Sequence, residues 1–255
     1  MKYRPLCRLA ILWFLFVASL CGAQNATIKM ALPEEGYAPY IIIKKDDVSG
    51  ILIEVLKLAA QQISLQIVFE YMPEKRSIVM LNEGRIDARM ESPRWIRDPE
   101  DYFWSEPIVN INDLFVYRNL DSNAFENDGD MQGAVLVTHL GYGYPTLQPL
   151  FDMAMVTRHD AATEVAMLNQ LQRKTGAAKK AVVMDRHVAL WLIKHHQAFK
   201  GRFKFSKRVI DSTPLHVQFT PSTKMEKWLP RLNAQIRKLK RSGVVEQIIE
   251  NTLKY

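Results

Sequence analysis

Cysteine is almost missing from this chain. Its 255 residues include only Cys7 and Cys21, and both lie in the N-terminal segment that we expect to be removed on export. The remaining chain therefore has no disulfide, no thiol nucleophile and no thiolate metal site. This excludes the small disulfide-stapled folds and the cysteine-dependent enzymes.

Long hydrophobic runs are also scarce, and the one at the N-terminus is short. Three basic residues precede an apolar run at 9–20, and small residues close the segment at 22–23. We predict a cleavable signal peptide over residues 1–23 and a periplasmic location. The run is about 12 residues, whereas a bilayer-spanning helix needs about 20, so a permanent anchor is the weaker alternative. A lipid anchor on Cys21 is a second alternative.

Sequence motifs of common enzymes are absent as well. There is no phosphate-binding loop and no G-x-S-x-G elbow. The histidines His187, His195 and His196 lack the i, i+4 spacing of a helical zinc pair, and we interpret them as a surface feature. We therefore predict a protein that is not an enzyme and that has no cofactor or metal. An enzyme that depends on Asp185 or Arg76 remains an alternative.

Charge of one sign is not strongly in excess. The leader carries three of the 34 Lys and Arg residues and none of the 27 acids, so its removal lowers the net charge from +7 to +4. No long basic run is interleaved with aromatic residues, and we predict no nucleic-acid partner.

The order of hydrophobic patterns predicts an α/β fold. Alternating and buried-type strands are interleaved with amphipathic helices twice along the chain, which is typical of parallel sheets with helices on their faces. In the first half we expect strands at 27–32, 40–44, 65–71 and 85–90 and helices at 51–63 and between Pro73 and Gly84. In the second half we expect strands at 134–138, 181–184 and 202–205 and helices at 161–172 and 188–195.

Two extended segments connect these halves. Residues 105–118 and 215–219 are predicted to cross between two lobes as hinge strands. After them, Thr223 and Glu226 have capping-box spacing, and two amphipathic helices follow at 225–239 and 244–253. The predicted class is therefore a two-lobed α/β fold, each lobe a mostly parallel sheet flanked by helices, joined by two hinge strands.

Several short stretches occur in an order that resembles a known family. They are the Tyr37–Tyr40 turn, Gly50, and the segments 82–88, 104–108 and 240–249. In this order they resemble the bacterial extracellular solute-binding proteins of family 3, which have a periplasmic-binding-protein-like fold. The resemblance implies lobe one at 24–113 and 214–255, with lobe two inserted at 114–213.

The same resemblance implies a function. A monomer would capture a small polar, carboxylate-bearing, amino-acid-like ligand by closing its lobes, and deliver it to an inner-membrane ABC-type transporter. A ligand-sensing module that acts with a membrane receptor is the alternative. A dehydratase-like cleft enzyme is the second alternative, because a few members of this fold family are dehydratases. The chain departs from the family pattern at Leu52, which replaces a usual acid, and at Glu74, which replaces a usual aromatic residue.

Candidate ligand-binding residues lie in the turns that follow the predicted strands, where ligands bind in open α/β sheets. Tyr37 and Tyr40 would form an aromatic wall, or one of them belongs to the core. Asp185 would accept an ammonium group, or caps a helix. The remaining candidates bind an anion: Arg76, Arg94 and Arg97 as a carboxylate clamp, and Gly141 and Tyr142 as a turn with free backbone N–H groups.

Overall fold

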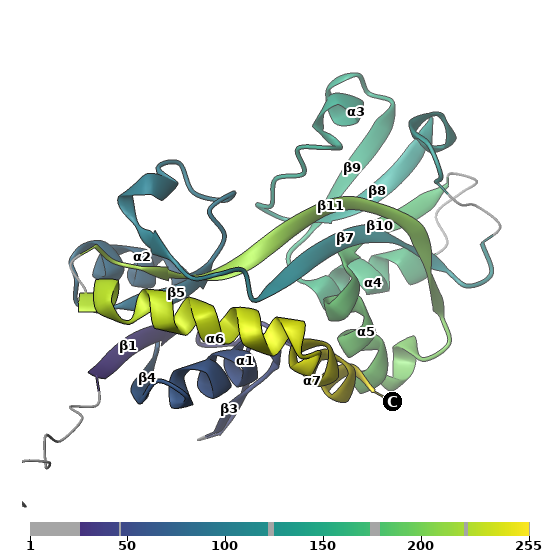
Figure 1. The fold of residues 1–255 in the computed structure, drawn as a ribbon. Helices are drawn as coiled ribbons and strands as arrows, with labels where there is room; N and C mark the ends of the chain where they lie inside the picture. The colour runs from purple at the N-terminus through teal and green to yellow at the C-terminus, as the bar shows by residue number, and fades with distance from the viewer. Residues whose placement is uncertain (1–25, 46, 122–124, 174–178, 222–223, 255) are drawn as a thin grey trace, which may run out of the picture.

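Figure 1 shows the computed structural model of the chain, which describes residues 26–45, 47–121, 125–173, 179–221 and 224–254. The predicted signal peptide and Thr223 of the predicted capping box lie outside these residues. In the described part of the chain, no helix is long and apolar enough to cross a membrane.

The first lobe is built on parallel strands, as predicted. β1 (Ala26–Leu32) pairs in parallel with β4 (Leu65–Tyr71) and with β5 (Ala88–Glu91). The helices α1 (Ile51–Gln61) and α2 (Glu74–Asn82) connect these strands. A small hairpin of β2 (Ile42–Lys44) and β3 (Asp47–Ser49) precedes α1. The apolar stripe of α1 is fully buried, which fixes the helix against the sheet.

The second lobe repeats this construction. β8 (Ala134–His139) lies between β9 (Val156–Ala161) and β10 (Lys180–Asp185), and all three are parallel. The helices are α3 (Gln148–Asp152), α4 (Glu164–Gln172) and α5 (Arg186–His195). The edge strand β9 was not predicted, because its sequence VTRHDA is mostly polar and carries no buried-strand pattern.

Two long antiparallel strands join the lobes (Figure 1). β7 (Val109–Arg118) and β11 (Phe203–Phe219) pair with each other, and β11 continues to pair with β5 and with β6 (Phe103–Trp104). The result is one nine-stranded sheet with the strand order β4-β1-β5-β11-β7-β10-β8-β9 and β6 on β11. The prediction of separate strands at 202–205 and 215–219 was wrong, because β11 runs unbroken through both. The lobe boundaries at 113 and 213 lie inside this ribbon and stay a prediction.

The C-terminal helices cover the first lobe. α6 (Leu229–Arg241) and α7 (Val244–Leu253) pack on α1, and Lys194 of α5 donates to the carbonyl of Thr252 at 3.2 Å. Pro230 lies in the first turn of α6, where its missing N–H has no helical partner to lose. Single 3₁₀ turns occur at Pro99–Asp101, Asp128–Met131, Gln197–Phe199 and Lys224–Lys227.

Gly50 fixes the approach of α1 to the turn at Tyr40. Its φ is +110°, and a Cβ there would lie 2.6 Å from the carbonyl oxygen of Tyr40. We expect Gly50→Ala to lower the free energy of unfolding by about 2 kcal/mol, since strained backbone and a close contact both add cost. Gly201 (φ +65°) has nothing within 4 Å of such a Cβ. Gly201→Ala is therefore the control, and equal loss in chemical denaturation of both variants would contradict the close-contact argument.

Candidate functional site

Three aspartates form a row across the strands where the two lobes meet. Asp113 of β7 lies in register with Asp185 of β10 on one side and with Asp211 of β11 on the other. Neighbouring strands are about 4.8 Å apart, so the three carboxylates repel one another. Burial first, and then the charges of Asp185 and Asp211, raise the pKa of Asp113 to about 7. Among the described residues no group of His, Cys, Asp or Glu is arranged to hold a metal ion.

Asp185 is the most connected member of this aspartate row. It is 4% exposed and accepts hydrogen bonds from the Tyr40 hydroxyl (2.8 Å), the Asn112 N–H (2.8 Å) and the Val188 N–H (2.9 Å). The last of these makes it the N-cap of α5, so it caps a helix and also faces the first lobe. Burial raises the pKa of Asp185, although His187 and these hydrogen bonds oppose the rise.

Tyr40 and Tyr37 have different roles in the structure. Tyr40 is fully buried, and its hydroxyl reaches across from the first lobe to Asp185. Tyr37 is half-buried and stacks on Tyr40 with ring centroids 5.4 Å apart. Burial, and then the charge of Asp185, raises the pKa of each tyrosine. Of the two predicted wall residues, Tyr40 therefore belongs to the core and Tyr37 is the accessible aromatic face.

The interpretation of His187 as a surface residue was wrong. Its Nδ1 lies 3.1 Å from the Tyr40 hydroxyl, and its ring meets the Tyr40 ring edge-on at 6.0 Å. Burial lowers the pKa of His187, the charge of Asp185 raises it, and Arg186 lowers it further. His195 and His196 are exposed, as expected.

A second aromatic group comes from the β8 side of the second lobe. Tyr142 stacks on His139 with centroids 4.1 Å apart, and His139 lies 3.9 Å from Glu164 at the start of α4. Burial first, and then the charge of Glu164, raise the pKa of Tyr142 to about 12. Gly141 has a φ of +84°, but α3 begins only at Gln148. The predicted anion-binding turn therefore does not sit directly at a helix start.

The three candidate arginines are not gathered into one clamp. Arg94 donates from Nη1 to the carbonyl of Ser212 at 2.7 Å and lies 3.7 Å from Asp211. Arg76 and Arg97 are exposed, and the side chain of neither has a hydrogen bond or ion pair within the described residues. Arg94 is thus the arginine that the structure places beside the aspartate row.

Sequence reasoning missed a buried ion pair on β5. Arg89 and Glu91 are 2.7 Å apart, with side chains only 7% and 8% exposed. Glu74 of α2 joins them at 3.3 Å from Arg89, so the residue that departs from the family pattern has a partner here. Burial raises the pKa of Glu91, while Arg89 lowers it. The signal was present as two charges at i, i+2 on a short strand, which places them on one face.

These features define a class of protein. Two α/β lobes joined by a pair of hinge strands, with polar residues of both lobes meeting in front of the hinge, are the architecture of a solute-binding protein. The sequence profile of the bacterial extracellular solute-binding proteins, family 3, matches residues 28–254, and the chain belongs to this family. No curated protein matches the chain significantly in sequence.

Solved structures share the fold at low sequence identity. The L-cystine solute receptor of Neisseria gonorrhoeae has a TM-score of 0.69 and 16% identity, over 90% of this chain and 93% of that chain. The second substrate binding domain of a putative amino acid ABC transporter from Streptococcus pneumoniae has a TM-score of 0.66 and 19% identity, over 89% of this chain and 99% of that chain. The BvgS periplasmic domain of B. pertussis has a TM-score of 0.65 and 18% identity, over 90% of this chain and 43% of that chain.

Proposed function

We propose that this protein is a periplasmic solute-binding protein that holds an amino-acid-like ligand between its lobes and delivers it, unchanged, to an ABC-type transporter in the inner membrane. The observation that carries the proposal is the hydrogen bond from Tyr40 of the first lobe to Asp185 of the second. A carboxylate that already joins the lobes is suited to joining them through a bound ammonium group instead. Ligand contacts to both lobes favour the closed state, which is how binding drives closure.

Each part of an amino acid has a complementary group at the lobe junction. The ammonium group would replace the Tyr40 hydroxyl at Asp185, since a charged donor bonds a carboxylate more strongly than a neutral one. Arg94 would bind the carboxylate through its second nitrogen, beside its present bond to Ser212. The Tyr37 ring would cover the ligand on the first-lobe side, as Tyr142 would on the other.

The charges at the junction favour a basic ligand over an acidic one. Four carboxylates contribute to it, from Asp113, Asp185, Asp211 and Glu164, and the Arg94 guanidinium opposes them. Opposite charge near a desolvated site attracts a ligand, and like charge repels it. We therefore propose arginine, lysine or ornithine as the ligand class, ahead of glutamate or aspartate.

Titration calorimetry against a panel of amino acids, organic acids and polyamines tests this proposal. We expect Tyr37→Ala to weaken the best ligand about tenfold, because stacking and cation–π contact are lost. Tyr37→Phe keeps the ring and is the control, with affinity within about twofold of the native protein because only the polar tip of the ring is removed. Tight binding of glutamate with no response to basic amino acids would contradict the charge argument.

Two further measurements separate the alternatives. A ligand that co-purifies and is recovered chemically unchanged after long incubation supports binding without chemistry; turnover would point to the dehydratase-like alternative. Ligand-dependent uptake with a reconstituted permease and ATPase supports delivery to a transporter. Ligand-dependent activity of a membrane kinase, with no uptake, would favour the sensing module.

A further inference from the structure

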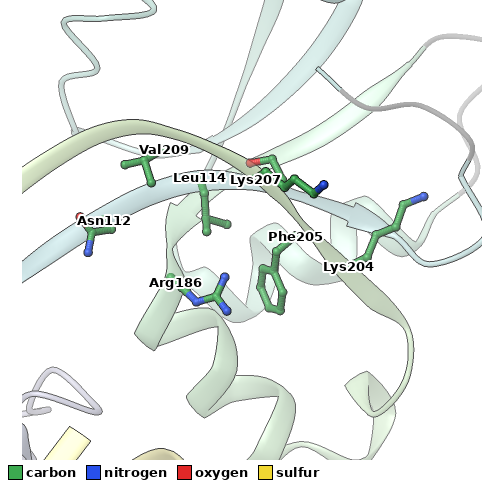
Figure 2. Close-up of a pocket in the computed structure, with 8 residues that line it drawn as sticks. Asn112, Leu114, Arg186, Lys204, Phe205, Lys207 and Val209 are labelled. Carbon is green, nitrogen blue, oxygen red and sulfur yellow. The ribbon is translucent and has the colours of Figure 1, made fainter. Parts of the chain in front are cut away.

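A pocket lies on the face of the paired hinge strands β7 and β11 that is opposite the aspartate row. Its volume is about 540 Å³, and it opens between β7, β11 and the start of α5 (Figure 2). Along β7 successive side chains alternate between faces, so Asn112 and Leu114 line this pocket while Asp113 between them points the other way. The pocket is lined by Asn112, Leu114, Arg186, Lys204, Phe205, Ser206, Lys207 and Val209.

The lining is basic and contains no acid. Arg186, Lys204 and Lys207 contribute three positive charges, and none of the three has a carboxylate partner in the described part of the chain. The Arg186 guanidinium lies over the Phe205 ring, 5.5 Å from its centroid, which holds it at the pocket. Lys204 donates to the carbonyl of Asp121. Elsewhere in this lobe an arginine can have a carboxylate partner, as Arg208 has in Asp128 at 2.7 Å, whereas the three cations at the pocket have none among the described residues.

A bulge in β11 builds one wall of the pocket. The pairing of β11 with β7 shifts between Phe205 and Val209 and again before Asp211. Ser206 anchors the bulge, because its hydroxyl accepts from the Phe115 N–H at 3.1 Å and donates to the Arg208 carbonyl at 2.7 Å. Bulges re-aim side chains and commonly lie beside binding sites. Here the bulge places Lys207 among the residues that line the pocket.

We propose that this pocket binds a small organic anion with two or more negative charges, a dicarboxylate or a phosphate monoester, independently of the ligand between the lobes. Three cations supply the charge, and the Asn112 side chain supplies a neutral polar group. Leu114, Phe205 and Val209 supply an apolar surface for a short carbon skeleton. A pocket of about 540 Å³ is within the range of roughly 300–1,000 Å³ that is usual for small-molecule sites.

Two residues that line the pocket, Arg186 and Asn112, are also directly connected to Asp185 at the lobe junction. Arg186 directly follows Asp185, and the Asn112 N–H donates to Asp185 at 2.8 Å. Arg186 is one of the charges that lower the pKa of His187, after burial and against the opposing effect of Asp185. An anion bound to Arg186 offsets that positive charge, so the pKa of His187 rises when the pocket is filled. His187 is therefore a reporter of occupancy.

Calorimetry of the purified protein at low ionic strength tests the proposal, with citrate, succinate, glycerol phosphate and inorganic phosphate as probes. We expect at least one probe to bind, and the double variant Arg186→Gln/Lys207→Gln to bind it at least about tenfold more weakly, because two charge-assisted contacts are lost. Lys238→Gln/Arg241→Gln removes the same charge from the exposed face of α6 and is the matched control. Its affinity should stay within about twofold, since distant exposed charges are screened.

The outcomes separate the pocket from general charge attraction. If no probe binds, or if the control loses as much affinity as the pocket variant, the proposal is wrong. A rise in the pKa of His187 on adding the probe, followed by NMR in the native protein, supports it without any variant. An unchanged His187 titration at saturating probe would overturn it even if the double variant failed to fold. Preference for carboxylates or for phosphates among the probes identifies the ligand class.

Discussion

Asp185→Ala is expected to abolish detectable ligand binding and to lower the free energy of unfolding by about 4 kcal/mol, the sum of a lost helix cap and buried donors left without an acceptor. Its carboxylate now accepts from Tyr40, Asn112 and Val188. Alanine leaves the Asn112 and Val188 N–H groups unpaired, and these backbone groups cannot turn away, whereas the Tyr40 hydroxyl keeps its contact with His187 at 3.1 Å. Urea denaturation and calorimetry with the best ligand measure the two effects separately.

Tyr40→Phe is the matched control for this substitution. It removes one donor to Asp185 and leaves the helix cap and the Asn112 bond in place, so we expect a loss of only about 1 kcal/mol of unfolding free energy. It should also keep ligand binding, because the ligand ammonium replaces that hydroxyl in the proposed complex. Native affinity in Asp185→Ala would contradict the assignment of Asp185 as the ammonium acceptor. A larger loss of affinity in Tyr40→Phe than in Asp185→Ala would contradict it as well.

The fold was largely predictable wherever a pattern was local. The bounds of β4 and α7 agree with the prediction, because alternation in LQIVFEY and the apolar spacing after Gly243 are clear signals. β9 and the middle of β11 were missed, because their polar residues carry no strand signal of their own. β9 is a strand through its pairing with β8, and the middle of β11 through its pairing with β7. Tertiary pairing overrides weak local preference there.

The candidate site divides in the same way. Asp185 stands directly after the predicted strand 181–184, and Tyr37 and Tyr40 lie in the turn that follows the predicted strand 27–32. The rule that ligands bind at strand ends was therefore enough to find them. Asp113 and His187 were not found, because their importance comes from what lies opposite them. Asp113 meets Asp185 and Asp211 only through the register of three strands that are far apart in sequence. No periodicity within one segment contains that information.

The same register gives Asp113→Asn an effect that depends on pH. The pKa of Asp113 is about 7 in the folded protein, against its ordinary value of 3.8 in the unfolded chain. Below about pH 3 the carboxyl is protonated in both states, and it contributes nothing to the difference between them. As the pH rises toward 7 the unfolded chain ionises while the folded protein resists ionisation. The free energy of unfolding therefore falls across this window and levels off above it.

We expect Asp113→Asn to be more stable than the native protein by about 3 kcal/mol at pH 8 and by less than about 1 kcal/mol at pH 4, since each pKa unit corresponds to about 1.4 kcal/mol and partial exposure discounts the total. Urea denaturation at pH 4, 6 and 8 measures this difference, with Asp47→Asn on the exposed strand β3 as the control. A constant difference at all three pH values would contradict the aspartate row as its source.

A basic ligand beside Asp113 favours its ionised form, so native binding near pH 7 should release a proton that the variant does not. Calorimetry in two buffers of different ionisation enthalpy detects that proton, and its absence from the native protein would place the ligand's cationic group away from Asp113.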